Sequence, residues 1–528
     1  YTLVYTLSLH DALPISVLGN TGGLTRSGLT FGGWNTQANG GGTTYQAGNV
    51  FAMGNGNVTL YALWSSGAGT TDPSGDLVAT FDSDGLVTHH SAAGGNNRDY
   101  GRGVAVDENG NVVVAGSSAS SGGTYPGDER TVWRYTSSGT LDSSFGGGDG
   151  IAIVADGSTQ SQLNSLLLHS SGRIVTGGSI GGGGGAVLNV FTESGALDTG
   201  FSSDGDWRRS ISGQSIWDIA EAGNGDIVFS GFDGRPGNQK ILVGRFGING
   251  TPDSAFGTDG ILELNDLGGG AGPEYGYSVE VDASGRILVG GAVHNGSDLD
   301  MFVARLLEDG SLDTSFGGDG TVIRDGDGVS GSGAQVVWDL EIGPDGSIYA
   351  IGGAGPDTAS FQGAIWKLNA DGSLNTTFGN GGFYSAAPGS KLLLRDGELD
   401  TAGYLIVAGE ISSADSTTGL DVYVTRVSST SADTDVNFGT SGEVFLDGNG
   451  YTDVVFDVAI ADSGVAYLTG IARTTSSQDT EDLAIWALDY PAGAFNVIPG
   501  TGGSGTSFSA DLDNWVTIDR SSSGTYST

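Results

Sequence analysis

Carboxylates recur beside glycines in this sequence, with a spacing that could bind a cation. Residues 81–85 read Phe-Asp-Ser-Asp-Gly, the oxygen-rich beginning of a calcium loop with Asp82 and Asp84 as ligands. Asp325 and Asp327 form a similar short segment. Neither segment continues to the distal Glu of a complete loop, and Asp-Gly also forms ordinary turns. Calcium is therefore the one cofactor that the sequence leaves open, and no other is expected.

A second candidate site combines an aromatic side chain with arginines. Trp207 offers a stacking surface, Arg208 and Arg209 are rare cations in an acidic chain, and Tyr275 lies in another variable segment. Arg and aromatic residues are enriched where binding energy concentrates. The alternative is that Trp207 packs against a neighbouring part of the fold. We take these four residues as the candidate ligand-binding site.

Catalytic motifs are missing from the sequence. Outside the first 16 residues the histidines are His89, His90, His169 and His294, which stand in unlike contexts. No HExxH, GxSxG or nucleophile–base set occurs. We therefore expect no enzyme and no catalytic residue.

The chain is organised by one repeated phrase, clearest at 312–320 (LDTSFGGDG). Its Phe recurs at intervals of 55 to 64 residues, which indicates a repeat architecture. The marker residues are Phe81, Phe145, Phe201, Phe256, Phe316, Phe378 and Phe438. The expected role of these Phe side chains is structural, as plugs between repeats.

An Asp near the start of the phrase is expected to satisfy turn amides. The clearest examples are Asp142, Asp253 and Asp313. A basic residue recurs on the strand before the phrase and could pair with this Asp. Because Asp198 lacks such a cation and Lys367 meets Asn375 instead of Asp, the pairing is expected to be partial.

Short runs of alternating or β-branched apolar residues, bounded by Asn-Gly, Asp-Gly or Ser-Gly, fill each repeat and predict four strands. Four antiparallel strands in about 60 residues fit a β-propeller blade. The inner hairpin occurs seven times, but the seventh copy lacks its fourth strand, whereas residues 77–90 supply a strand without a hairpin. We therefore predict an all-β, seven-bladed β-propeller with one-plus-three closure, which leaves no open sheet edge.

Residues 76–490 resemble the delta-60 repeat family through the LDxSFG…DGxhhhxG pattern of each unit. The resemblance implies a propeller-like domain of large bacterial surface or secreted proteins, with no established activity. The pattern departs from the family at two places. The sixth unit lacks Leu-Asp before Phe438, and the last unit has no FGxxG.

The segments outside the repeats predict further modules. Residues 17–64 resemble part of an internalin-type B-repeat, which implies a truncated small β-grasp-like module. Residues 6–16 look like a translated sequencing adapter, so 1–16 are expected to be an artefact and the chain a fragment. Residues 65–75 and 491–505 are linkers by composition, and 506–528 predict the truncated start of another β-domain.

The composition of the chain excludes some classes of binding partner. The formal charge is −41, with 61 Asp and Glu against 20 Lys and Arg, which argues against nucleic acid and anionic membranes. The chain has no Cys, and no apolar run is long enough for membrane insertion. Because no Cys is present, disulfides are excluded. The absence of Cys does not indicate in which cellular compartment the protein works.

Loop length gives the functional expectation. Connections between the second and third strands, and from each fourth strand to the next blade, are long and variable, so they should share one face. We expect a monomeric, extracellular or cell-surface module that binds an unknown glycan or surface protein through that face. A purely structural spacer is the first alternative, and a hydrolase or lyase with a site in the central funnel is the second. Clustered acids and aromatics at the funnel mouth would favour binding or catalysis over the spacer.

The incomplete Asp-Gly loops predict weak calcium dependence. Adding a chelator in a monovalent-salt buffer should shift the melting temperature by about 2 °C or less, because specific sites need completed oxygen cages. Thermal unfolding with and without calcium measures this. A large, stoichiometric shift specific to calcium would contradict the expectation.

Overall fold

The computed structural model describes residues 75–490 with short gaps, together with the backbone of five strands nearer the N-terminus. The gaps are 95–97, 121–127, 156–159, 182–183, 236–238, 326–332, 356–360, 387–390, 413–418, 447–450 and 474–480. The five strands are β1 (Pro14–Ser16), β2 (Leu29–Asn35), β3 (Thr44–Tyr45), β4 (Val50–Ala52) and β5 (Tyr61–Ser66). They form the sheet β3-β2-β5 and the pair β1-β4. The predicted domain at 506–528 lies outside the described residues.

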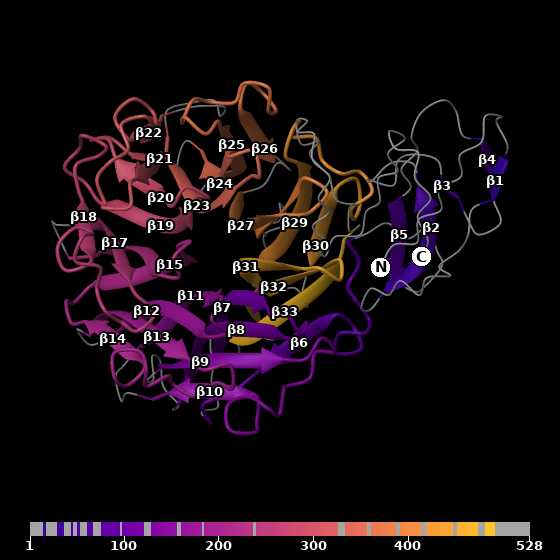
Figure 1. Ribbon diagram of the computed structural model, residues 1–528, viewed down its shortest axis with the longest axis horizontal. Helices are drawn as coiled ribbons and strands as arrows, with labels where there is room; N and C mark the ends of the chain where they lie inside the picture. Colours follow the sequence, from indigo (N-terminus) through magenta and orange to yellow (C-terminus); the bar gives the residue numbers. More distant parts are fainter. Residues whose placement is uncertain are drawn as a thin grey trace, which may run out of the picture.

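Within the described part of 75–490, seven four-stranded antiparallel sheets stand around a central axis as the blades of a β-propeller, and no helix occurs (Figure 1). Blades 1 to 3 are β7 (Asp99–Val106), β8 (Val112–Ala119), β9 (Asp128–Tyr135), β10 (Ile151–Val154); β11 (Gln162–Leu168), β12 (Ile174–Ile180), β13 (Gly185–Phe191), β14 (Asp206–Arg209); and β15 (Gln214–Glu221), β16 (Ile227–Asp233), β17 (Lys240–Phe246), β18 (Ile261–Leu264). Blades 4 and 5 are β19 (Glu274–Val281), β20 (Ile287–His294), β21 (Leu299–Leu306), β22 (Thr321–Arg324); and β23 (Gln335–Ile342), β24 (Ile348–Ala354), β25 (Gln362–Leu368), β26 (Phe383–Ala386). Blade 6 is β27 (Leu392–Leu399), β28 (Tyr404–Ser412), β29 (Leu420–Ser428) and β30 (Glu443–Leu446).

Blade 7 joins the two ends of the repeat region. Its sheet contains β31 (Val454–Ala461), β32 (Val465–Arg473), β33 (Glu481–Asp489) and, as the fourth strand, β6 (Leu86–His89). β6 pairs with β33 in the register Leu483↔His89 to Trp486↔Leu86. The predicted seven-bladed fold with one-plus-three closure is therefore confirmed.

The seven marker Phe side chains are fully buried, each with no exposed surface. Phe145 of blade 1 packs in one cluster with Leu163, Ile174 and Phe191 of blade 2, and Phe81 packs between blades 7 and 1 in the same way. The Phe therefore seals the interface between its own blade and the next. Burying such a ring stabilises the fold by about 3 kcal/mol.

Cations on the third strands connect the repeated phrase to the next blade. Arg305 Nε donates to Asp313 Oδ2 at 2.9 Å and its guanidinium lies 4.6 Å from the Phe316 ring. Arg305 Nη1 also donates to the carbonyl of Ala370 in the following blade. Arg134 pairs with Asp142 at 2.8 Å and Arg245 with Asp253 at 3.4 Å. Elsewhere the partner changes, as expected, since Asp198 pairs with Arg173 and Lys367 Nζ donates to the Ser429 carbonyl.

The antiparallel order decides which connections share a face. Consecutive strands of a blade alternate in direction, so the turns after the first and third strands lie at one end of the ring. The connections after the second and fourth strands lie at the other end. The inner strands begin at that second face, where the connections vary in length from blade to blade. The expectation that the long connections share this face was wrong, because the connection after each third strand, which carries the repeated phrase, is longer, as from Tyr135 at the end of β9 to Ile151 at the start of β10. No helix in the described residues is long and apolar enough to span a membrane.

Replacing the seam residue tests the importance of closure. Phe81→Ala should lower the free energy of unfolding by about 3–5 kcal/mol, because the fully buried ring leaves a cavity between blades 7 and 1. Phe445→Ala, at a ring that is 51% exposed, is the matched control and should cost less than about 1 kcal/mol. Urea unfolding measures both. Equal losses would mean that the seam does not limit the stability of the ring.

Candidate functional site

Every inner strand carries a β-bulge at the same repeat position. The pairing with the second strand shifts register by one residue in all seven described blades. A bulge re-aims the local side chains, and bulges are common beside functional sites. The bulged residues are Arg102, Asn164, Trp217, Tyr277, Trp338, Arg395 and Phe456.

The residue after each bulge forms a belt around the channel. In blade order these residues are Gly103, Ser165, Asp218, Ser278, Asp339, Asp396 and Asp457. From blade 3 onward, each side chain accepts a hydrogen bond from a backbone amide of the next blade. The amides of Val279, Gly397, Val458 and Val104 donate to the four Asp carboxylates at 2.8, 3.2, 2.8 and 2.6 Å.

A neutral side chain can make the same contact between blades in this belt. Ser278 Oγ accepts from the Leu340 amide at 3.0 Å, in the same place where other blades use Asp. Gly103 has no side chain, and a Cβ there would stand 2.9 Å from the Leu166 nitrogen, so blade 2 packs too closely for a larger residue. Holding the blades together therefore does not require the four charges.

A second acidic tier lies two residues further along three inner strands. Glu280, Glu341 and Glu398 are half-buried in the channel. Burial raises the pKa of Glu341 to about 7 and of Glu398 to about 8. Burial, followed by repulsion from Glu341 and Asp218, raises the pKa of Glu280 well above its ordinary value. Glu341 and Glu398 therefore pass from neutral to charged as the pH rises through about 7 to 8.

Asp396 and Asp457 lie in adjacent blades and each affects the protonation of the other. Burial raises the pKa of Asp457 to about 6. Burial, with repulsion from Asp339 and Asp457, raises the pKa of Asp396 well above its ordinary value. Like charges this close cannot both ionise at low cost.

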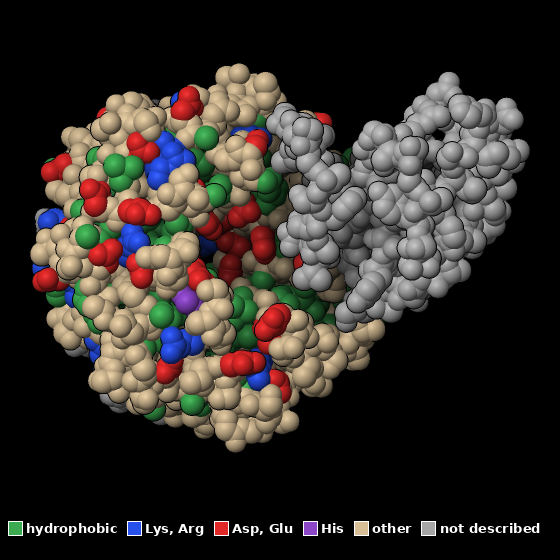
Figure 2. Space-filling model, viewed as in Figure 1, with side chains coloured by type: hydrophobic (Ala, Val, Ile, Leu, Met, Phe, Trp, Pro, Cys, Tyr) green, Lys and Arg blue, Asp and Glu red, His purple; other side chains and the backbone are tan. Residues whose placement is uncertain are grey.

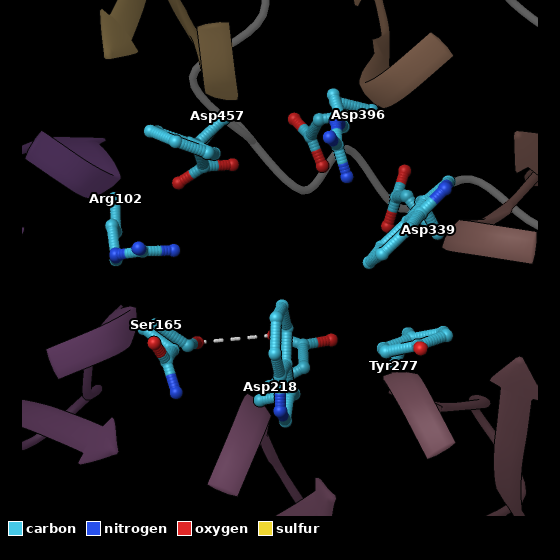
Figure 3. Close-up of a pocket in the computed structure, with 12 residues that line it drawn as sticks. Arg102, Ser165, Asp218, Tyr277, Asp339, Asp396 and Asp457 are labelled. Atoms are coloured by element: carbon cyan, nitrogen blue, oxygen red, sulfur yellow. Dashed lines mark hydrogen bonds between the residues drawn. The ribbon is translucent and has the colours of Figure 1, made fainter. Parts of the chain in front are cut away.

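The bulge and belt residues enclose a cavity of about 90 Å³, with room for several water molecules. Figure 3 shows Arg102, Asp218, Tyr277, Asp339, Asp396 and Asp457 arranged around a common open centre. Figure 2 shows acidic side chains gathered in the central hollow of the ring. The channel is therefore an acidic, partly enclosed recess.

Aromatic rings make a rigid wall on one side of the cavity. Tyr277 stacks on Trp338 with ring centroids 4.2 Å apart and on Tyr275 at 5.5 Å. The Arg395 guanidinium lies 4.4 Å from the Trp338 ring, and Trp217 stacks on Phe232 at 5.9 Å. Because their faces are largely covered, these rings offer mainly their edges to the channel. Arg395 also pairs with Glu410 at 2.6 Å.

Some polar atoms of the cavity wall lack a partner. Asn164 is only 8% exposed and donates to Ser215 Oγ and the Ile216 carbonyl, but its Oδ1 accepts no hydrogen bond within the described residues. Arg102 Nε, Trp217 Nε1 and Trp338 Nε1 are likewise without a partner there. An unsatisfied buried polar atom costs free energy, so each of these positions calls for a ligand or water.

The structure places the four predicted binding residues in two different blades. The expected loop at 206–209 was wrong, since these residues form β14, the fourth strand of blade 2. Trp207 packs on Phe246 with centroids 4.7 Å apart, Arg208 pairs with Asp206 at 2.7 Å, and Arg209 pairs with Glu263 at 2.9 Å. The contact of Trp207 with Phe246 is the packing role that the sequence offered as the alternative for Trp207. Tyr275 stacks on Tyr277 of the cavity wall, with ring centroids 5.5 Å apart.

The predicted calcium residues do not come together. Asp84 Oδ1 accepts from the Leu86 amide at 3.1 Å, as a turn residue does, and Asp82 and Asp325 are exposed. Asp327 lies outside the described residues. Where the structure is described, no three His, Cys, Asp or Glu side chains are placed to hold a metal ion.

The channel acids were missed because the first strands were interpreted only as alternating apolar segments. A signal exists in the dipeptides Trp217-Asp218, Trp338-Asp339, Arg395-Asp396 and Phe456-Asp457. Each stands at the same distance before the tight turn of its repeat. A charged residue at a constant position of the innermost strand can only face the channel or an adjacent blade.

Comparison with protein families agrees with the fold. A family described as a domain of unknown function (DUF5122) β-propeller matches residues 108–145, 283–316 and 343–378. A β-propeller repeat matches residues 92–123. The chain carries propeller repeats. A Listeria-Bacteroides repeat domain matches residues 16–63 of the propeller chain, close to the predicted 17–64 module. The narrower delta-60 and internalin-type assignments stay predictions.

Individual relatives are distant or short. A protein of Evansella cellulosilytica named as a Gly-rich membrane protein is 51% identical over 41 residues, which cover 8% of this chain and 5% of that protein. Virginiamycin B lyase from Staphylococcus aureus is 12% identical, with 77% of this chain and 99% of that chain covered and a TM-score of 0.38. Polysaccharide lyase Uly1 is 13% identical, with 74% and 90% covered and a TM-score of 0.42. No activity follows from similarity at this level.

The raised carboxyl pKa values predict a specific pH dependence. A group with a raised folded pKa binds protons more tightly when folded, so its stabilising effect is lost as pH rises through that pKa. The melting temperature should therefore fall between pH 5 and pH 8.5. The double variant Glu341→Gln, Glu398→Gln should flatten this slope and gain about 2 kcal/mol at pH 8.5.

Glu108→Gln, Glu193→Gln removes two exposed carboxylates and is the matched control. It should leave the slope between pH 5 and 8.5 unchanged. Calorimetric melting across this range measures both variants. A wild-type protein that becomes more stable on going from pH 5 to 8.5 would contradict the charge repulsion in the channel.

Proposed function

We propose that this protein is a non-catalytic binding module of a surface-exposed bacterial protein, and that its ligand enters the central channel from the face that carries the connections after the second and fourth strands, which vary from blade to blade. The observation that carries this proposal is the excess of charge in the belt. Ser278 makes the same inter-blade contact as the four Asp residues without a charge. Groups that lower stability where a neutral residue would serve are typical of functional sites.

The form of the recess supports the same function. Acids and aromatic residues line the cavity together, which was the combination expected to favour binding or catalysis over a spacer. The wall also contains the unpartnered Asn164 Oδ1 and Trp338 Nε1, which a ligand would satisfy. The proposed ligand is a glycan or a component of a surface protein, and the acidic charge disfavours nucleic acid.

Acid–base catalysis is the second candidate, because the carboxyl groups of Asp396 and Asp457 line the recess and burial raises the pKa of both. Both carboxylates also accept backbone amides of the next blade, at 2.8 and 2.6 Å. These bonds favour a fixed binding wall over groups that exchange protons with a substrate.

Binding by the whole chain tests the proposal. The labelled protein should bind a subset of glycans on an array, or bacterial cell surfaces. The double variant Trp217→Ala, Trp338→Ala should lose affinity by a factor of about ten or more. Leu307→Ala, Phe445→Ala is the matched control, since both side chains are exposed outside the channel.

Stability of each variant is checked by melting before binding is compared. Loss of binding in the channel variant alone supports the proposal, and equal binding by both variants would refute it. Mass spectrometry of recovered ligand separates the two candidate functions. Any turnover that Asp457→Asn abolishes would favour catalysis.

A further inference from the structure

The channel carboxyls are arranged along the axis as well as around it. The belt acids directly follow the bulges, and Glu280, Glu341 and Glu398 stand two residues further along the inner strands. Two residues of a β-strand span about 6.7 Å. The recess therefore offers two acidic tiers, one below the other. A ligand that engages both must be elongated along the channel.

The charge balance of the recess favours a cation. Four carboxyl groups line it, and the three of Glu280, Glu341 and Glu398 follow two residues further along the inner strands, against the guanidinium groups of Arg102 and Arg395. Arg395 is already paired with Glu410 at 2.6 Å. A positively charged ligand would reduce the repulsion among carboxyls that burial holds close together.

An independent polar atom calls for a hydrogen-bond donor. Asn164 lines the cavity, is 8% exposed, and its amide nitrogen is already held by Ser215 and Ile216. Its Oδ1 is left without a partner within the described residues. This oxygen can only accept a hydrogen bond. An ammonium group supplies three donors and no acceptor, which suits both the amide oxygen and the carboxylates.

A compact metal ion does not suit the same groups. In the described part of the chain, no three acidic or His side chains converge closely enough to hold one. Three acceptor positions of Asp218 are also taken, because Oδ1 accepts from Ser165 and Ile219, and Oδ2 accepts from Val279. The charges are distributed around and along the recess, so the positive charge of the ligand must be distributed too.

Resting on the proposed function, we propose that the channel binds a linear aliphatic polyammonium chain, with one ammonium at each acidic tier. The methylene chain between the charges would pass the edges of Trp217 and Tyr277, which are apolar apart from the indole N–H and phenol O–H. Free polyamines and the lysine side chains of a peptide share this chemistry. The two sources are distinguished by experiment.

Isothermal titration of the whole protein with 1,4-diaminobutane and spermidine tests the proposal, with 1,4-butanediol as the neutral isostere and butylamine as the single cation. Saturable binding of the diamine, at least tenfold tighter than butylamine and with no binding of the diol, is expected. Equal binding of diamine and diol would overturn the proposal. A calcium or magnesium ion that binds as tightly as the diamine would also overturn it.

A lysine-rich peptide and its fully N-acetylated form make the second arm. Tight binding of the peptide, weakened at least tenfold by acetylation, identifies lysine side chains as a source, whereas tight spermidine binding alone identifies free polyamines. If the acetylated peptide binds as well as the unmodified one, ammonium groups are not what the channel recognises, and the proposal fails.

The pH dependence of the affinity is a further test, because a purely structural role of the carboxyls would not produce it. Cations bind the ionised carboxyls, so affinity should rise at least tenfold from pH 5.5 to 8.5, with proton release on binding at neutral pH. The strand β11 contributes no titratable group to this region. The groups that face one another there are Arg102, Asp218, Tyr277, Glu280, Asp339, Glu341, Arg395, Asp396, Glu398 and Asp457. Affinity that is constant or falls over this range would contradict the proposal.

Variants locate the binding. Asp339→Asn, Glu341→Gln removes one charge from each tier and keeps an acceptor for the Gly397 and Leu399 amides. It should weaken diamine binding at least tenfold, whereas Glu108→Gln, Glu193→Gln, with the same charge change on the exposed surface, should not. If the channel variant does not fold, the comparison of diamine with diol and the pH series still decide.

The two proposals fail in different ways. If a neutral glycan binds, and Trp217→Ala, Trp338→Ala abolishes that binding while diamines do not bind, the channel is a binding site but not one for cations. If neither class of ligand binds the wild-type protein, the proposed function fails as well.

Discussion

The pairing of β6 with β33 is the contact on which the ring depends, because it makes the first and last parts of the repeat region one sheet. Without it blade 7 would end at β33 and leave an unpaired edge beside blade 1. The marker Phe81 is fully buried at the same seam. Closure therefore combines backbone hydrogen bonds with the burial that every other blade interface uses. It also brings Asp457 of blade 7 within 2.6 Å of the Val104 amide of blade 1, which continues the belt across the seam.

Two kinds of contact hold neighbouring blades together, one near the rim and one at the axis. Near the rim, the buried Phe and the cation on the third strand bridge to the next blade, as Arg305 does through Phe316 and the Ala370 carbonyl. At the axis, from blade 3 onward, the side chain after the bulge accepts an amide of the next inner strand. The buried Phe recurs at every interface, whereas the cation and its partner change in some blades. The axial contacts differ in charge from blade to blade. The candidate site consists of these differing residues at equivalent positions of the repeats.

The acids of the channel lower the stability of the fold. Burial and mutual repulsion hold their pKa values above the ordinary range, so that ionising them at neutral pH opposes folding. Marginal stability makes such a cost significant even in a large ring. The two arginines that line the cavity, Arg102 and Arg395, compensate only in part, since Arg395 also pairs with Glu410. A ligand that carries positive charge into the channel would offset this cost and would stabilise the folded ring by mass action.

The repeat of Phe every 55 to 64 residues, the tight turns and the missing fourth strand of the last unit determined the blade, the number of blades and the closure from sequence alone. These features are periodic, and each has a local physical cause in turn chemistry or strand alternation. The site could not be found in the same way, because it consists of single residues from strands separated by about 60 positions that meet only when the ring closes. Trp207 and Trp338 look equally suited to binding in the sequence. Only the tertiary structure decided that Trp207 packs between blades while Trp338 lines the channel, since strand order and the bulge, not residue type, set where each side chain points.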